Sequence, residues 1–587
     1  MRMRKLLPLF LLLMMAAVII TGCTQSSQTA APQADIEPPA DDEPPADEPK
    51  GEQILRYGAS GFNGIFNPIM FENIYDGYIS NIIFEKLITH TPEAEFVPAI
   101  AEWSLSEDNL TYTFTLKDGI KFSDGTDLTA KDVAFTYMTI AHPSYDGPNA
   151  HAVSNLEGYE EYHGKETETF EGIQVIDEKN ISFTFKDGMA APANIECFDY
   201  GIMPSDYYAF ETWEDFLALI DKPMGSGIMT LDSYEPKQFI LLKNNTNYWD
   251  PENGAQIDGV LINEVPDESI LSALQAGQID FAQISSSAEN LEAAKAMDNI
   301  NISNYIGNGY TFMCFNTTKP SLGDVRVRQA LMHALDRESF IKVQYGEGLG
   351  AVGMVPISPA SWAFPDISEL NPYSFDMEKA AQLMDEAGWL MGPDGYRYKD
   401  NQKLTLSWLI YTEAAWPGTL SGMAADTWKQ LGVDLSIELM DGNSVIARTM
   451  GPEPGKKDFD IYALGFSLEI DPDPTGFLFD DDACVAGGFN ASGYKNSEAM
   501  DLVRAGKIEF DMEKRAEIYK EWAKIMNEEI PHVIIAYRSE IWGINKRVND
   551  MLIDTYATWD LLSLTLLKNK GLIIIVISII IRPFNCI

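Results

Sequence analysis

Alternating polar and apolar residues predict a strand with one buried face near the start of the chain. In Thr111–Leu116, three apolar side chains alternate strictly with three threonines. Two glycine-containing turns follow, and Thr129 can then cap a helix, with Asp132 at the capping-box position. We therefore expect a half-buried strand at Thr111–Leu116 and a helix that runs to about Ile140.

A second segment, residues 310–316, is apolar on both faces. Phe312 and Cys314 point to one side of an extended chain, and Met313 and Phe315 point to the other. A strand of this kind is suited to burial on both sides.

The residues after Asp324 predict one amphipathic helix. Asp324 can cap its first turn, and glycines in 346–350 can end it. The expected buried face repeats at steps of four, three and seven residues: Val327, Leu331, Ala334 and Ile341.

Beyond this point, helix-like and strand-like segments alternate. The predicted order is a helix from Asp376 to Gly388, a strand at 404–411, a helix at 424–431, and strands at 434–439 and 459–466. This alternation indicates an α/β fold in the second half of the chain.

Length and charge narrow the class of protein. A chain of 587 residues exceeds the size of a single hydrophobic core, so two or more lobes are expected. The formal net charge of −46 repels phosphate backbones, which makes nucleic acid a poor partner. So many carboxylates indicate a solvated surface, or else a preference for cationic ligands.

Motifs for catalysis or metal binding do not emerge from the sequence. The six histidines include no H-E-x-x-H pair, and the five cysteines include no C-x-x-C pair or recognisable disulfide framework. No G-x-S-x-G nucleophile turn occurs. We therefore predict no enzyme activity, no cofactor and no metal site.

The first 52 residues read as an export signal followed by a tether. Residues 1–22 combine basic residues with a short apolar run, as in a secretory signal peptide. The run ends at Cys23 in a pattern that resembles the lipobox of bacterial lipoproteins, which implies lipid attachment at Cys23. Residues 23–52 are rich in proline and acidic residues, so we expect a disordered tether.

The last residues, 568–587, form an atypical hydrophobic tail. Residues 572–581 are apolar apart from Ser578, and ten residues are too few to cross a bilayer as a helix. Our hypothesis is that this tail arises from a disrupted reading frame.

Several motifs, which follow one another along the chain in the order of a known family, carry a resemblance to it. The chain resembles the family 5 extracellular solute-binding proteins, the dipeptide, oligopeptide and nickel receptors of ABC importers. The resemblance covers about residues 53 to 567. It rests on segments 97–103, 110–126, 128–133, 315–317, 324–331, 336–338, 378–389 and 459–474.

The resemblance implies a two-lobed α/β fold of the periplasmic-binding-protein (Venus flytrap) type. The larger lobe would comprise 53–309, with an inserted subdomain at about 99–225, and would be rejoined by 531–567. The smaller lobe would comprise 310–530. Two crossover strands, at 310–316 and 531–537, would join the lobes and allow them to close on a ligand.

The resemblance also places the ligand site. Peptide receptors of this family pair the peptide's ammonium with an aspartate shortly after a glycine–aromatic pair, which here is Gly465-Phe466. A one-residue insertion leaves Glu469 or Asp471 as the candidate anion, or else these acids only cap a turn. The candidate lining residues are Phe466, Trp416, Tyr310 and Asn316, with core packing as the alternative role of Trp416.

The expected function is the capture of short peptides for an ABC permease. The receptor would act as a monomer and would be lipid-anchored at the outer face of the cytoplasmic membrane, or periplasmic. Alternatives with the same fold are receptors for a nickel chelate, haem, an oligosaccharide or a signalling peptide. A surface adhesin or chaperone-like lipoprotein is a different class, and a hydrolase has the least support.

Overall fold

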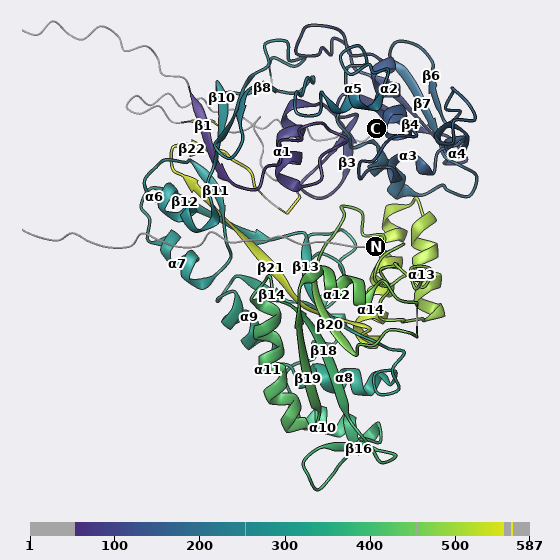
Figure 1. The fold of residues 1–587 in the computed structure, drawn as a ribbon, viewed down its shortest axis with the longest axis vertical. Coiled ribbons are helices and arrows are strands. Elements are labelled where there is room, and N and C mark those ends of the chain that lie inside the picture. Colours follow the sequence, from purple (N-terminus) through teal and green to yellow (C-terminus); the bar gives the residue numbers. More distant parts are fainter. Residues whose placement is uncertain (1–52, 253, 454, 554, 557–564, 567–587) are drawn as a thin grey trace, which may run out of the picture. The chain divides into compact units, whose positions relative to one another are not determined.

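The computed structural model describes residues 53–566, except 253, 454, 554 and 557–564 (Figure 1). The predicted signal peptide, the tether, the lipid-attachment residue Cys23 and the tail at 568–587 lie outside the described residues. None of the helices within the described ranges combines the length and apolar character that a bilayer crossing requires.

A mixed sheet of twelve strands forms the centre of the fold. From one edge to the other it contains β19 (Asp434–Met440), β18 (Thr405–Tyr411), β20 (Ile461–Ser467), β13 (Gly309–Phe315), β21 (His532–Asn545), β11 (Phe281–Ile284), β1 (Ile54–Ala59), β10 (Gly259–Glu264), β9 (Phe239–Asn244) and β8 (Met229–Glu235). Two more strands, β12 (Ile300–Ile306) and β14 (Gly350–Val352), also pair with β21.

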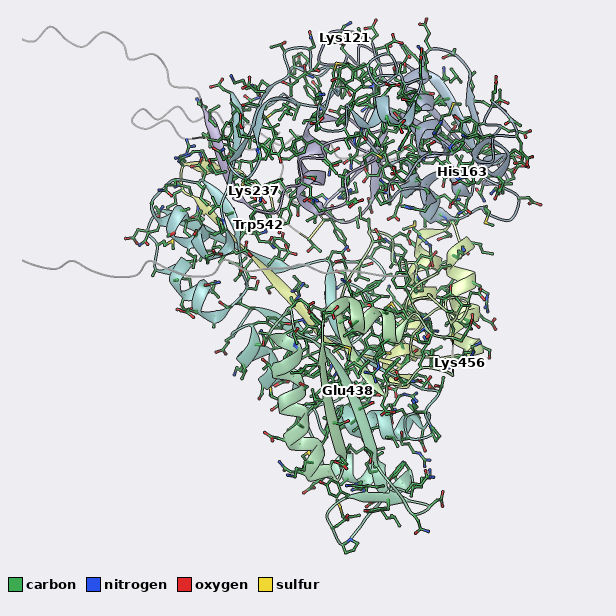
Figure 2. The ribbon with its side chains drawn as sticks, viewed as in Figure 1. Lys121, His163, Lys237, Glu438, Lys456 and Trp542 are labelled. Carbon is green, nitrogen blue, oxygen red and sulfur yellow. The ribbon has the colours of Figure 1, made fainter. Side chains whose placement is uncertain are left out.

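The longest strand, β21, belongs to both halves of this sheet. Its first half pairs with β13 and β14, and its second half pairs with β11 and β12. Figure 1 shows β21 running from the neighbourhood of β11 to that of β13 and β20. Trp542 lies on its second half (Figure 2). The Trp542 ring stacks with that of Phe281 at a centroid distance of 6.1 Å. Both strands expected as crossovers, β13 and β21, are therefore present and paired.

The prediction that β13 is buried on both faces is confirmed. Phe312 and Cys314 belong to one hydrophobic cluster, and Met313 and Phe315 belong to another. All four side chains are at most 1% exposed. The sheet is thus covered on both sides at this strand.

Four smaller sheets contain the remaining strands of the described residues. They are β4 (Ala101–Leu105), β5 (Thr111–Leu116), β7 (Asn180–Thr184) and β6 (Ile173–Val175); β2 (Ile88–His90) and β3 (Phe96–Pro98); β15 (Leu390–Met391), β16 (Arg397–Lys399) and β17 (Gln402–Lys403); and β22 (Val548–Asn549) and β23 (Thr565–Leu566). Strand β5 has the predicted bounds and the predicted buried face.

The helices cover these sheets. They are α1 (Ile74–Ile83), α2 (Ala130–Ile140), α3 (His151–Ser154), α4 (Tyr159–His163), α5 (Trp213–Leu217), α6 (Ile270–Gln275), α7 (Ala288–Lys295), α8 (Val325–His333), α9 (Arg337–Gln344), α10 (Met377–Glu386), α11 (Trp416–Leu431), α12 (Gly442–Thr449), α13 (Ser497–Ile508) and α14 (Met512–Glu529), with 3-10 turns η1 (Pro192–Phe198), η2 (Asp267–Ser269) and η3 (Ile367–Glu369). Helix α2 begins after Thr129, whose main-chain N–H donates to the Asp132 carboxylate at 2.9 Å, as the capping box predicts.

The prediction of a single helix after Asp324 is wrong. The segment forms two helices, α8 and α9, because Asp336 starts a new one: its carboxylate accepts the Ser339 N–H at 2.9 Å. The expected apolar residues are nonetheless buried: Val327 and Leu331 on α8, Ala334 just after it and Ile341 on α9. The helix expected at 424–431 is longer than predicted and begins at Trp416.

Within the part of the chain that the structure describes, three hydrophobic clusters make up the core. The first is built mainly from residues 55–262, together with a few residues of 542–566. The other two lie within 270–541 and cover the sheet around β13, β18 and β20. The domain boundaries given above stay a prediction.

Candidate functional site

One edge of strand β20 is open at five of its seven residues. Strand β18 pairs with β20 only at Ile461 and Tyr462, so residues 463–467 have β13 as their only partner strand in the described part of the chain. An open strand edge with free main-chain groups can accept another extended chain.

The register of β20 on β13 identifies the groups at this edge. Asn316 N donates to Asp460 O at 2.8 Å, and Leu468 N donates to Asn308 O at 3.1 Å. Hydrogen-bonded pairs alternate in an antiparallel ladder. The even-numbered residues of β20 therefore bond to β13, and Gly465 and Ser467 direct their N–H and C=O groups to the open edge.

A cavity of about 480 Å³ adjoins this edge. It is lined by 57–60, 283–286, 307–309, 465–467 and 538–540, with Tyr75, Asp267, Ile270 and Tyr345. We call it the edge cavity. Its volume lies in the range of small-ligand sites.

A second cavity of about 820 Å³ has an acidic lining, and we call it the acidic cavity. Its Asp, Glu and Lys lining residues are Lys86, Glu196, Asp199, Glu469, Asp471, Asp473 and Lys507. Two of the acids are paired, Asp199 with Lys86 at 3.0 Å and Asp471 with Arg515. A small cavity of about 30 Å³ shares Phe466 with the edge cavity and shares Glu469 and Asp471 with the acidic cavity.

The two candidate anions have different surroundings. The Asp471 carboxylate accepts two hydrogen bonds from the Arg515 guanidinium, one of them at 2.8 Å from Nη2 to Oδ1. Burial opposes both charges and raises the pKa of Asp471, whereas the charge and the hydrogen bonds of the carboxylate raise the pKa of Arg515. Glu469 is exposed, and its carboxylate forms no ion pair within the described residues. Of the two, Glu469 is the acid available to a ligand.

Glu196, which sequence reasoning missed, joins η1 to the loop that follows β20. Its carboxylate Oε1 accepts the Asp471 main-chain N–H at 2.8 Å. Burial, followed by the nearby Asp471 carboxylate, raises the pKa of Glu196 to about 8. Glu196 is therefore largely protonated at neutral pH, and no short-range sequence pattern indicated its contact with Asp471.

The other candidate lining residues divide into two groups. Tyr310 and Phe466 stack with ring centroids 5.8 Å apart, and both line the small cavity. Trp416 is 5% exposed and donates its Nε1–H to the Tyr411 hydroxyl at 2.7 Å. Asn316 is fully buried, and its Nδ2 donates to Phe459 O at 2.9 Å. Neither Trp416 nor Asn316 lines any of the three described cavities.

Comparison with known proteins places the chain in a family. The model of the bacterial extracellular solute-binding proteins, family 5 Middle, matches residues 95–486. The oligopeptide-binding protein AppA of Bacillus subtilis is 25% identical over 542 residues, covering 91% of this chain and 94% of AppA. The dipeptide-binding protein of Escherichia coli is 26% identical over 530 residues, covering 85% of this chain and 92% of that protein.

The fold agrees with this assignment. The solved structure of Bacillus subtilis AppA in complex with a nonapeptide matches with a TM-score of 0.67 at 24% identity, over 88% of this chain and 100% of that one. The predicted two-lobed α/β fold is thereby confirmed. The chain belongs to the family 5 bacterial extracellular solute-binding proteins.

Proposed function

We propose that this protein captures short peptides and delivers them to an ABC import permease, held at the membrane by a lipid on Cys23. The observation that carries the proposal is the open edge of β20 at Gly465 and Ser467, which faces a cavity. AppA and the dipeptide-binding protein, which share the family, bind peptides according to their names.

An extended peptide fits this edge through its main chain. Its N–H and C=O groups would complete the ladder that β18 leaves unfinished, as in other cases of strand addition. Side chains would project alternately from the peptide, so they would contribute less to binding than the shared main chain.

The peptide's ammonium group would pair with Glu469. This carboxylate follows the open edge by two residues and carries no competing cation in the described part of the chain. A charge-assisted hydrogen bond at that position would fix which end of the peptide lies there. Asp471, already paired with Arg515, would hold the loop that presents Glu469.

Closure of the lobes would complete the capture. We propose 310–316 and 531–537, within β13 and β21, as the crossovers about which the lobes move. A receptor of this kind signals to its permease only if the ligand favours the closed state over the open one.

The test compares peptides with free and acetylated amino groups on the wild type and on Glu469→Gln. We expect Glu469→Gln to weaken the binding of free-amine peptides about tenfold or more, and the binding of acetylated peptides much less. Isothermal titration calorimetry on the lipid-free protein measures both. Equal losses for the two peptide classes would reject the role of Glu469.

A second measurement tests the peptide class itself. Peptides that co-purify with the protein should appear in native mass spectrometry, and methylation of one main-chain nitrogen should reduce affinity where it faces the open edge. A protein that retains no peptide but retains a metal chelate, haem or sugar would overturn the proposal.

A further inference from the structure

Glu196 connects two parts of the chain that the predicted lobe boundaries separate. It lies in η1, within the predicted larger lobe, and its Oε1 accepts the main-chain N–H of Asp471 at 2.8 Å. Asp471 belongs to the predicted smaller lobe. The turn η1 also contacts α3 of its own predicted lobe and α13 of the other. If the lobes move apart about β13 and β21, the hydrogen bond between Glu196 and Asp471 breaks.

This hydrogen bond reaches the loop that carries the proposed ammonium partner, Glu469. Asp471 follows Glu469 by two residues, and both line the acidic cavity together with Glu196. The Asp471 main chain is bound to η1, and its side chain is bound to Arg515 of α14 through a buried ion pair. A change at Glu196 therefore acts directly on the segment that follows the open edge of β20.

Three carboxylates face Glu196. Asp471 and Glu469 come from the loop after β20, and Asp199 comes from the end of η1. The hydrogen bond from Asp471 N favours the charged form of Glu196, but burial and the three negative charges outweigh it and raise the pKa of Glu196 to about 8. The other titratable side chains of the acidic cavity, from the elements around η1, are Lys86, His151, Cys197, Tyr200, Asp473 and Lys507.

The proton on Glu196 links lobe closure to pH. Once the lobes separate, Glu196 would leave Asp471 and Glu469 and gain contact with water, so its pKa would return toward the ordinary value of 4.5. Between pH of about 4.5 and 8, closing would therefore take up a proton. A process that takes up a proton becomes less favourable as pH rises.

We propose that the hydrogen bond between Glu196 and Asp471 N is a latch on the closed receptor, which holds the predicted lobes together more firmly at acidic pH than at alkaline pH. This inference rests on the proposed function, because it concerns the regulation of the same site. Glu196 is a positioning residue here, since it acts on the ligand through the loop that carries Glu469. The ammonium of a bound peptide would offset part of the repulsion between the acids, so binding would take up less than one full proton.

The first test measures peptide affinity by isothermal titration calorimetry between about pH 5.5 and pH 7, where the peptide's own amino group stays largely charged. The wild-type affinity should fall about threefold or more over this range. Glu196→Gln should give a flatter profile, because its amide oxygen still accepts the Asp471 N–H and carries no charge. Titrations in buffers of different ionisation heat should also show fewer protons taken up by this variant.

Two further variants separate the latch from other causes. Glu196→Ala removes the acceptor, so it should weaken binding about threefold or more at about pH 5.5, whereas Glu196→Gln should retain the wild-type affinity there. His151→Gln is titrated in parallel, because His151 lines the same cavity. This variant should keep the pH dependence of the wild type.

Small-angle X-ray scattering tests the latch without any peptide. The wild type should have a smaller radius of gyration at about pH 5.5 than at about pH 8, because closure takes up a proton. Glu196→Gln should stay compact at both values. Glu196→Ala should be as extended at the lower pH as the wild type is at the higher one.

The outcomes distinguish the latch from the peptide function. A pH dependence of affinity and radius that persists unchanged in Glu196→Gln would overturn the latch and leave the peptide function standing. Loss of the dependence in His151→Gln alone would overturn the latch as well. If the wild type bound no peptide at any pH but showed the predicted change in radius, the proposed function would fail and the latch would stand.

Discussion

At the scale of single residues, the pair of Asp471 and Arg515 matters most for the architecture of the site. The Arg515 side chain is 0% exposed and that of Asp471 is 9% exposed. Arg515 also donates through Nε to Gly506 O at 2.9 Å, which ties the loop after β20 to the end of α13. We propose that this pair holds the loop that carries Glu469.

Removing one partner of this buried pair should be costly. Arg515→Met would leave the Asp471 carboxylate buried without its cation, and we expect a loss of about 3–5 kcal/mol in the free energy of unfolding. Urea denaturation measures the loss. Arg504→Met, which breaks the exposed pair with Asp481, should cost less than about 1 kcal/mol, and similar values for both variants would contradict this account.

At the scale of elements, local sequence patterns predicted a helix or strand correctly where residues adjacent in the sequence determine its bounds. The period-two pattern of β5 and the Thr129–Asp132 capping box gave bounds that the structure confirms. The break between α8 and α9 was missed because the apolar repeat continues across it. The apolar repeat predicts that the first helix continues, whereas a cap at Asp336 predicts that a new helix begins there. The structure follows the cap.

The contribution of the Asp336 cap to the free energy of unfolding should be measurable. Asp336→Ala removes the acceptor for Ser339 N, and we expect a loss of about 1 kcal/mol in the free energy of unfolding. Asp336→Asn keeps a capping oxygen and should be close to neutral. Chemical denaturation of both variants provides the check, and an equal loss for Asn and Ala would mean that the cap is not the cause.

The candidate site was predictable only in part. The Gly465-Phe466 pair and Glu469 lie in one continuous segment, so a family resemblance could indicate them. Arg538, Tyr345 and Glu196 come from distant parts of the chain, and only the folded sheet and the loops around it bring them to the cavities. Trp416 was uncertain because an aromatic residue after a strand can fill either a pocket or the core, and here it packs in the core.

At the scale of the whole molecule, the contact between Glu196 and Asp471 joins residues 275 positions apart. Glu196 also faces Glu469 and Asp199, whose negative charges add to the effect of burial. Because its pKa is raised to about 8, the folded protein keeps a proton that the unfolded chain has released above a pH of about 4.5.

Stability should consequently fall with rising pH through the Glu196 carboxyl. Between pH of about 4.5 and 8, the folded state binds more protons than the unfolded state, so the free energy of unfolding decreases as pH rises and levels off above 8. Glu196→Gln should lack this contribution. The Tm of the variant relative to that of the wild type should therefore rise with pH across that range, and a constant difference would contradict this account.

The open edge of β20 has a consequence for what the cell could take up. Every peptide repeats the same backbone unit, whatever its residues, so the proposed binding surface of Gly465 and Ser467 main-chain groups would discriminate little between sequences. Under the proposed function, one receptor would accept peptides of many sequences, and its selectivity would lie in the free amino group that pairs with Glu469.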